Sequence, residues 1–409
     1  MKIRKRKFHI LEANEIKMSI VIFGDLFSFP EGQAATNRIY TYAKGLRENG
    51  INVYVICFSN IYMDKPNGII DGISYYNPFE QKQRSQYFFM RRWHKIKKYR
   101  KTYAILKQIN KADKISAINR WSDTFITQFF GWVLALMFKA KVITECNEHP
   151  LRNYQQGLIR KKAGVIKFYT DCFFSHGILC ISRYLENFHL QRGIRKGKLF
   201  VVPSTVDPSR FKKGGEKPIP GFYIGYFGSL TFKRDNVDML IRAFAIACQK
   251  RNAVSLVLGG FSTDSERRQM VDLIEKSGIK SKVIILDYLT RQEIANYICH
   301  SDILVMVRAE DLESEASYPS KLTEFLATGA PVISVNVGEV SDFLIDGVNS
   351  FLVQPGNYEQ LADKLNFVID NYESLRNVGI QGRELTERVF NYNYQAKRIA
   401  QFIKGLDQL

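Results

Sequence analysis

The sequence predicts an α/β protein with two doubly wound, Rossmann-like sheets, and three observations support this. Short apolar runs typical of buried strands alternate with amphipathic stretches of helical period. The alternation occurs in two blocks, one beginning near Met18 and the other near Gly221. Between the blocks, residues 212–221 contain three glycines and two prolines, a composition typical of a linker.

The first block opens with the pattern strand, loop, helix, strand. Residues 18–24 (MSIVIFG) and 51–58 (INVYVICF) are apolar runs of strand length. Between them, residues 35–50 place Ile39, Tyr42 and Leu46 at helical spacing. This order predicts the start of a parallel α/β unit.

The second block continues the same alternation. We expect strands within 221–230, 253–261, 282–289, 302–307 and 331–338, and helices within 237–250, 266–278, 291–301 and 321–329. A last helix, 393–406, is expected to cross back to the first domain. The predicted organisation is therefore a basic extension (1–17), a first domain (18–203), a second domain (204–389) and a returning C-terminal segment (390–409).

The positive charge of the chain belongs to one domain. The net charge is +19, yet residues 1–200 hold 35 Lys and Arg against 14 Asp and Glu, whereas residues 201–409 hold 24 against 26. A two-domain protein with one half facing an anionic surface accounts for this asymmetry better than a general nucleic-acid binder does.

The cysteine content and the hydropathy pattern indicate in which compartment the protein is expected. The six cysteines form no metal or redox motif, and the basic start is not followed by the apolar run of a signal peptide. The longest apolar stretch, 125–140, falls short of the ~20 residues of a spanning helix. We therefore expect a cytoplasmic protein.

The segment YPSKLTEFLATGAPVIS, 318–334, carries the clearest functional signal. Pro319 suits the first turn of a helix on which Ser320 and Glu324 share one side. Free N–H groups at a helix N-terminus, with the charge of Lys321 beside them, make an anion site. A carboxylate one turn further in can accept two ribose hydroxyls. The alternative is a capped surface helix.

This segment resembles the donor-binding signature of family-four retaining glycosyltransferases, in the branch that reads Pro-Ser-Lys-x-x-Glu followed by Ala, Gly and Pro-Val-Ile. Residues 338–353, 176–188 and 198–211 match the family's Gly-rich stretch and interdomain passages. The resemblance implies the GT-B fold, in which two Rossmann-like domains face one another across a cleft. It also implies a nucleotide-diphosphate sugar as donor, bound by the second domain.

One position departs from the family. The fuller motif has a glutamate eight positions before Glu324, where this sequence has Ala316. Because the family's first glutamate contacts the donor sugar, that contact is in question. Glu313 or Glu315 is a possible substitute, and the alternative is that both are solvated loop charges.

The strand end and loop at 225–240 (GYFGSLTFKRDNVDML) match the family's diphosphate-binding loop. The resemblance assigns Gly228, Ser229, Lys233 and Arg234 to the donor diphosphate, with Ser229 standing where the family often has arginine. Cations there stabilise a leaving group whose charge rises in the transition state. We expect Lys233 and Glu324 to act in catalysis, and the alternative for 233–234 is a generic basic loop.

The first domain offers weaker candidates. Gly32 and Gln33 lie in the first strand-to-helix loop, which the family places beside the transferred sugar, and Arg38 faces either the phosphates or solvent. After the strand predicted at 140–144 come Glu145, Glu148 and His149 at an edge that lines the cleft. We expect them to contact substrate, Glu145 as a catalytic residue; the alternative is a structural Glu-His cluster.

Residues 90–111 predict a basic amphipathic helix. Trp93 and five further apolar residues recur every three or four positions, and between Arg84 and Arg120 there are twelve Lys and Arg against Asp113 alone. Cations beside aromatic residues suit an anionic leaflet, to which the apolar 125–138 segment adds surface. We expect membrane contact through Arg91, Arg92, Trp93, Lys97 and Lys98. The alternative is a stripe packed on the core.

The sequence thus predicts a retaining, metal-independent glycosyltransferase, since no Asp-x-Asp metal motif is present. It is expected to need no cofactor and to use a polyprenyl-diphosphate saccharide as acceptor, at the inner face of the plasma membrane. A GT-B enzyme with a soluble acceptor, a nucleotide-sugar epimerase and a basic nucleic-acid-binding protein are the alternatives, although no nucleic-acid motif is seen.

Overall fold

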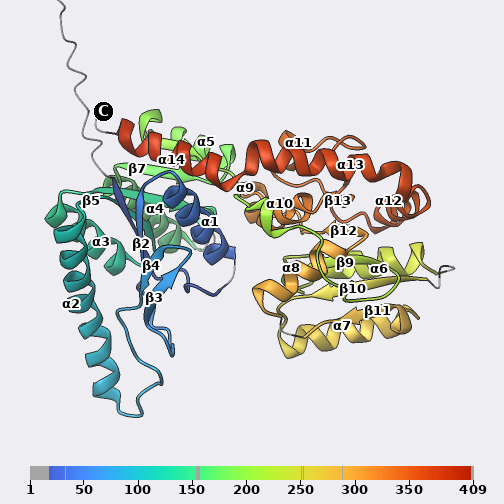
Figure 1. Cartoon of the computed structure of the whole chain (residues 1–409), viewed down its shortest axis with the longest axis horizontal. Coiled ribbons are helices and arrows are strands. Elements are labelled where there is room, and N and C mark those ends of the chain that lie inside the picture. The colour runs from blue at the N-terminus through green and yellow to red at the C-terminus, as the bar shows by residue number, and fades with distance from the viewer. Residues whose placement is uncertain are drawn as a thin grey trace, which may run out of the picture.

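The computed structural model describes residues 18–32, 34–152, 157–249, 251, 253–287 and 289–406. Its strands form two separate sheets, each covered by helices, which lie side by side as two lobes in Figure 1. The extension 1–17 predicted from the sequence lies outside the described residues.

The first sheet has eight strands in the order β3-β4-β2-β1-β5-β6-β7-β8. All neighbouring pairs are parallel except β3 and β4. The strands are β1 Ser19–Gly24, β2 Asn52–Cys57, β3 Asn67–Ile70, β4 Ile73–Tyr76, β5 Ile115–Trp121, β6 Lys141–Cys146, β7 Gly177–Cys180 and β8 Leu199–Val201.

Helices cover both faces of this sheet. One face packs against α1 and the C-terminal helix α14, and the opposite face packs against α2 and α3. The helix α4 packs beside α3 over β6 and β7. The helices are α1 Ala34–Glu48, α2 Phe88–Ala112, α3 Phe125–Phe138, α4 Leu158–Phe173, α5 Arg183–Leu190 and α14 Tyr392–Gly405.

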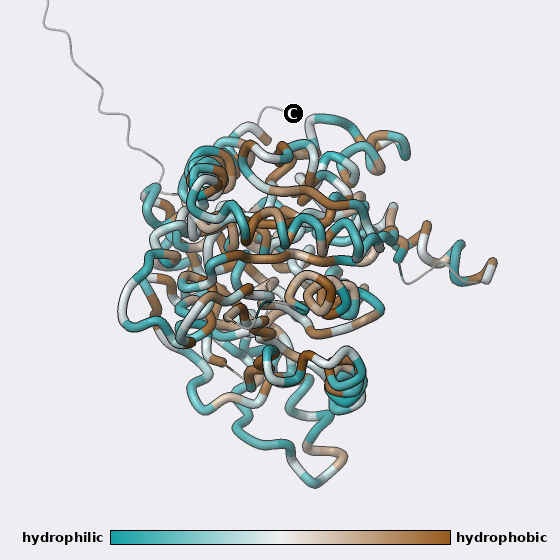
Figure 2. Tube along the Cα trace, turned by 90° about the vertical axis from the view of Figure 1, so that its right-hand side faces the viewer, coloured by the Kyte–Doolittle hydropathy of each residue, from teal (hydrophilic) through white to brown (hydrophobic). Residues whose placement is uncertain are grey.

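The second sheet has six parallel strands in the order β11-β10-β9-β12-β13-β14. The strands are β9 Phe222–Phe227, β10 Val254–Gly259, β11 Val283–Ile285, β12 Ile303–Met306, β13 Val332–Val335 and β14 Phe351–Val353. The helices are α6 Val237–Ala247, α7 Asp264–Lys276, α8 Arg291–His300, α9 Leu312–Ala316, α10 Ser320–Ala327, α11 Val340–Phe343, α12 Tyr358–Asp370 and α13 Tyr372–Leu385. Figure 2 shows hydrophobic residues along the inner strands and hydrophilic residues on the outer helical turns.

The chain passes between the sheets at two adjacent places. The backbone N–H of Val206 donates to the carbonyl of Phe390 (2.9 Å), and the N–H of Tyr392 donates to the carbonyl of Val206 (3.0 Å). After this crossing α14 returns to the first domain, where Ala396 and Ile399 join the core beneath α1. The two connections therefore form one paired hinge.

The β3–β4 hairpin is one of the elements that the sequence analysis did not predict. Asp71 and Gly72 both have positive φ (47° and 74°) and close the antiparallel β3–β4 hairpin. An Asp-Gly pair is a recognised signal of a two-residue hairpin turn, so this element was readable from the sequence. Among the described residues, no helix is long and apolar enough to cross a membrane.

Candidate functional site

The loop after β9 is held close to the end of β10. The N–H of Gly228 donates to the carbonyl of Gly259 (2.9 Å), and a Cβ on Gly260, whose φ is 146°, would lie 1.7 Å from the carbonyl oxygen of Gly228. Only glycine permits this approach. The turn leaves Ser229 and Lys233 exposed at the carboxyl edge of the second sheet.

Hydrogen bonds within the loop fix the next residues. Thr231 Oγ1 donates to Asp235 Oδ2 (2.7 Å) and accepts from the N–H of Asp235 (3.2 Å). Arg234 forms an ion pair with Glu313 (3.6 Å). Burial raises the pKa of Asp235, and Arg234, together with Lys321 on α10, opposes the shift. The cationic loop and α10 therefore face one another.

The N-terminus of α10 is open. Pro319 is its N-cap, no side chain caps it, and no acid lies in its first turn. The N–H of Leu322 donates to the carbonyl of Pro319 (3.1 Å), which leaves the N–H groups of Ser320 and Lys321 for an anion. Burial lowers the pKa of Lys321, and the nearby Glu324 carboxylate opposes the shift. Across the cleft, Asn37 Nδ2 on α1 donates to Glu324 Oε1 (3.5 Å). Glu324 thus lies where the two domains meet.

The position of the missing glutamate is part of the domain contact. Ala316 is fully buried among first-domain residues, and Ser182 Oγ donates to its carbonyl (2.6 Å). A side chain at 316 has no access to the cleft. Glu313 and Glu315 are partly exposed and lie on α9 rather than in a loop. Glu313 pairs with Arg234, and Glu315 accepts from the N–H of Gly338 (3.4 Å).

Arg38 faces neither phosphates nor solvent, which corrects the sequence prediction. Its guanidinium donates to the carbonyls of Pro203 and Val202 (both 2.8 Å), lies 3.6 Å from Glu145 Oε2 and packs over the Tyr42 ring (4.7 Å). These partners surround it because α1 packs directly on the hinge. Arg38 therefore holds the chain where it leaves the first domain.

Glu145 and His149 are also corrected, because both are buried. The Glu145 side chain is 2% exposed and accepts from Asn119 Nδ2 (3.2 Å), and burial raises its pKa. The His149 ring packs 4.6 Å from that of Phe188, and burial lowers its pKa. Both side chains are therefore packed inside the first domain. Glu148 is exposed but forms an ion pair with Arg152.

The first strand-to-helix loop of the first domain requires glycine at position 32 for steric reasons. A Cβ on Gly32 would lie 2.2 Å from Thr36 Oγ1 and 2.3 Å from Ser28 Oγ, and Thr36 Oγ1 donates to the carbonyl of Ser28 (2.6 Å). The tight turn therefore requires glycine whether or not a ligand binds. Gln33 lies outside the described residues.

The basic helix α2 divides into two halves. Its C-terminal half buries Leu106 and Ile109 on the core, whereas Trp93 in the N-terminal half is 56% exposed. Lys98 is wrongly predicted as a membrane contact: its Nζ donates to the carbonyl of Phe58 (2.8 Å) and to Asn60 Oδ1 (2.9 Å). Lys98 falls on the side of the helix that meets the sheet. Arg91, Arg92 and Lys97 lie in the stretch that carries Trp93.

Several residues near the cleft escaped the sequence prediction. Arg308 lies two residues after the end of β12, is largely buried near Asp235, and donates from Nε to Ser314 Oγ (2.8 Å). Its position shortly after a buried strand was the signal by which the sequence could have identified it. Glu339 Oε1 accepts from the N–H of Tyr184 (2.7 Å), which joins the start of α5 to the second domain.

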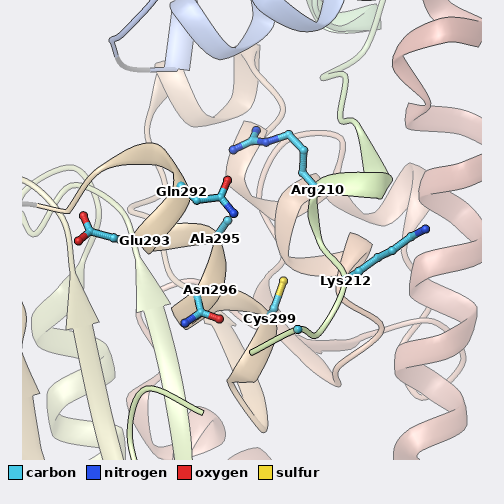
Figure 3. A pocket seen from close by; sticks show the side chains of 8 residues that line it. Arg210, Lys212, Gln292, Glu293, Ala295, Asn296 and Cys299 are labelled. Carbon is cyan, nitrogen blue, oxygen red and sulfur yellow. The ribbon is translucent and has the colours of Figure 1, made fainter. Parts of the chain in front are cut away.

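Two cavities border the hinge rather than the donor residues. One of about 440 Å³ is lined by Arg210, Lys212, Gly214, Gln292, Glu293, Ala295, Asn296 and Cys299. Figure 3 shows Arg210 and Gln292 pointing toward one another. The other, about 330 Å³, lies between α1, the linker and α8, where Arg291 packs over the Tyr40 ring (4.2 Å). Burial and Arg210 lower the pKa of Arg291 to about 10.

Comparison with known proteins connects this cleft to an enzyme class. Residues 209–385 match the family model "Glycosyl transferases group 1". The chain is 23% identical over 217 residues to an uncharacterized glycosyltransferase of Methanocaldococcus jannaschii (52% of this chain, 55% of that protein). It is 26% identical over 172 residues to a capsular polysaccharide biosynthesis glycosyltransferase of Staphylococcus aureus (42% of each). The alignments thus span about half the length of these relatives.

Solved structures match nearly the whole chain. Sucrose-phosphate synthase from Thermosynechococcus elongatus superposes with a TM-score of 0.70 at 16% identity, covering 96% of this chain and 99% of that one. The Anabaena protein HepE, in complex with UDP and glucose, gives 0.66 at 15% identity (95% and 100%). The chain has the GT-B fold of glycosyltransferases.

The GT-B fold predicted from the sequence is therefore confirmed. In this GT-B chain the open α10 N-terminus and the cationic 231–235 loop both lie inside the matched 209–385 segment. The first-domain candidates lie outside that segment, and it is there that the structure corrects the predictions.

Proposed function

We propose that this chain is a family-four retaining glycosyltransferase that uses a nucleotide-diphosphate sugar. The observation that carries the proposal is the convergence of the open α10 N-terminus, Lys321 and the 231–235 loop within the segment that matches group 1 glycosyltransferases. The HepE complex with UDP supports the choice of donor. On this proposal residues 204–389 bind the donor and residues 18–203 bind the acceptor.

Each donor-site group has a distinct role in this proposal. Lys233, Arg234 and Lys321, with the N–H groups of Ser320 and Lys321 at the start of α10, bind the diphosphate and stabilise its charge as the glycosidic bond breaks. Gly228 and Ser229 bring the backbone close to the phosphates. Glu324 accepts the ribose hydroxyls.

The proposed reaction keeps the anomeric configuration through front-face attack. The acceptor hydroxyl attacks on the side from which the diphosphate leaves, and the departing phosphate oxygen takes its proton. This scheme needs no protein base, which agrees with the burial of Glu145 and His149. Glu148 stays available to an acceptor because it is exposed.

For the acceptor we propose a polyprenyl-diphosphate saccharide in surface polysaccharide assembly, reached at the inner face of the plasma membrane. The basic first domain and the exposed half of α2 support a membrane acceptor, as does the named role of the staphylococcal relative in capsular polysaccharide biosynthesis. A soluble acceptor is the second candidate, because another relative, from Nocardiopsis dassonvillei, is named D-inositol 3-phosphate glycosyltransferase (27% identity).

Nucleotide-dependent thermal stabilisation tests the donor site. One nucleoside diphosphate should raise the melting temperature, since a ligand at 100 times its Kd adds about 2.7 kcal/mol to stability. The Lys321→Ala variant should lose the response, and the matched control Lys276→Ala, on the exposed surface of α7, should keep it. Stabilisation by no nucleotide would contradict the proposal. An inverted anomeric centre in the product, measured by NMR, would refute the retaining mechanism alone.

A further inference from the structure

The helix α3 presents an uncharged apolar surface to solvent. Its fourteen residues include no Asp, Glu, Lys or Arg. One side buries Leu134 and Phe138 on the sheet, while Phe125 (57% exposed), Ile126 (67%), Phe129, Leu136 and Met137 face outward. Soluble monomeric proteins rarely leave such a continuous apolar strip uncovered.

The strip continues onto α4. The Trp132 ring on α3 lies 4.8 Å from the ring of Phe174, which directly follows α4. Three side chains of α4 at seven-residue spacing, Ile159, Ile166 and Phe173, share one side of the helix and are all exposed. The buried contacts of α4 with the domain use a different stripe, which includes Phe168 and Cys172.

On its other flank, α3 meets α2. The Tyr99 ring of α2 lies 4.8 Å from the Phe130 ring of α3, so the two helices are neighbours. Beyond this contact the N-terminal half of α2 exposes further apolar side chains, which are Phe88, Phe89, Met90, Trp93 and Ile96. The three helices thus form one surface, which we name the docking face.

The charges of the docking face lie on its flanks. The helix α2 has nine Lys and Arg and no acid, and α4 has Arg160, Lys161, Lys162 and Lys167 against Asp171 alone. Asp171 is already paired with Lys167. An apolar centre between two cationic borders is complementary to a bilayer whose headgroups are negative and whose acyl region begins a few ångströms below.

The topology fixes the orientation of this face. Each of the three helices follows a strand of the parallel run, so each begins at the carboxyl edge of the first sheet. The loop after β1 and the start of α1, whose Asn37 touches Glu324, lie at the same edge. Figure 1 shows α2 extending past the sheet at this end. The first turns of the helices therefore lie at the same edge of the first sheet as the contact between Asn37 and Glu324.

We propose that α2, α3 and α4 together dock on an anionic lipid leaflet and hold the acceptor side of the cleft against it. The inference rests on the proposed function, which gives the reason for the protein to bind a membrane. It adds α4 to the docking face, with a role equal to those of α2 and α3. The apolar strip inserts between the lipid headgroups, and the flanking Lys and Arg side chains bind the negatively charged headgroups. An acceptor attached to lipid would then reach the cleft without leaving the membrane surface.

Flotation with vesicles tests the docking face on the full chain. Wild-type protein should float with phosphatidylglycerol-rich vesicles and hardly with pure phosphatidylcholine. Ile126→Glu and Ile159→Glu should each weaken binding by about tenfold or more. Replacing Arg160, Lys161 and Lys162 by Gln should weaken it by about fivefold per cation. The matched control is Ile380→Glu, an exposed apolar residue (50%) on α13 of the second domain, which should bind as wild type does.

Donor binding separates this proposal from the proposed function. Every variant should keep its thermal response to nucleotide, because the altered side chains are exposed and lie outside the donor site. Equal binding to both vesicle types, or wild-type binding by Ile159→Glu, would overturn the docking face while leaving the transferase intact. A dimer that Ile126→Glu dissociates, without vesicle binding, would identify a second copy as the occupant and would also overturn it.

Discussion

Replacing Arg38 by Met tests whether the Arg38–Glu145 pair is structural. The substitution keeps the aliphatic stem but removes the donors to the carbonyls of Val202 and Pro203 and the charge beside Glu145. Glu145 then remains as a buried carboxylate without a counter-ion. Because the lost group donates to two backbone carbonyls and pairs with a buried carboxylate, the effect should fall at the upper end of single-residue changes.

The expected loss of stability is about 3–5 kcal/mol, the usual cost of removing one partner from a buried ion pair. For a domain of this size each kcal/mol lowers the melting temperature by about 2–4 °C. The Glu145→Gln change in the same background should recover much of the loss, since glutamine carries no charge and can still accept from Asn119.

The pH dependence of the stability lost in Arg38→Met gives a second measurement. The pKa of Glu145 is raised by burial, so the folded state binds its proton more tightly than the unfolded state does, and stability falls as pH rises through this window. Without Arg38 the pKa should rise further. The loss of unfolding free energy caused by Arg38→Met, measured by urea unfolding, should therefore be larger at about pH 8 than at about pH 5. A loss below about 1 kcal/mol, or no rescue by Glu145→Gln, would refute the structural role.

Four further substitutions probe the rest of the molecule. Glu324→Gln and Lys321→Ala should each lower turnover by about 100-fold or more without unfolding the protein, and unchanged activity in both would mean that the donor site lies elsewhere. Ala316→Glu should not restore a family contact but destabilise the chain by about 3 kcal/mol or more, because it buries a charge in the domain contact; thermal unfolding measures this. Burial lowers the pKa of Lys98 to about 8, so the unfolded state binds this proton more tightly and the stability contribution of Lys98 rises with pH above that value. In Lys98→Met that rise, followed by urea unfolding, should disappear.

The predictions of the donor-site residues in the second domain could each be made from a short stretch of sequence. Lys321 and Glu324 lie on a helix whose N-cap is Pro319, and the spacing of neighbours on a helix is fixed by its period. The 231–235 loop likewise follows a strand directly. Such features are decided by sequence neighbours, which is why their placement in helix and loop could be read in advance.

The first-domain predictions failed where burial decides the role. Arg38, Glu145, His149 and Lys98 are polar residues on elements that the sequence located well enough, yet each points into packed structure. Their partners, such as the carbonyls of 202–203 for Arg38, lie far away along the chain. No local pattern distinguishes a cation that faces solvent from one that satisfies distant carbonyls.

The sequence alone determined the two largely parallel sheets, the helix that begins at Ser320 and the concentration of positive charge in the first half, because periodicity, turn residues and charge are properties of neighbouring positions. Only the tertiary structure decided which half of α2 is exposed, that Ala316 lies in the domain contact, and that α3 is an uncovered apolar helix between basic α2 and α4. These outcomes depend on how distant segments pack, since burial is a property of the assembled fold.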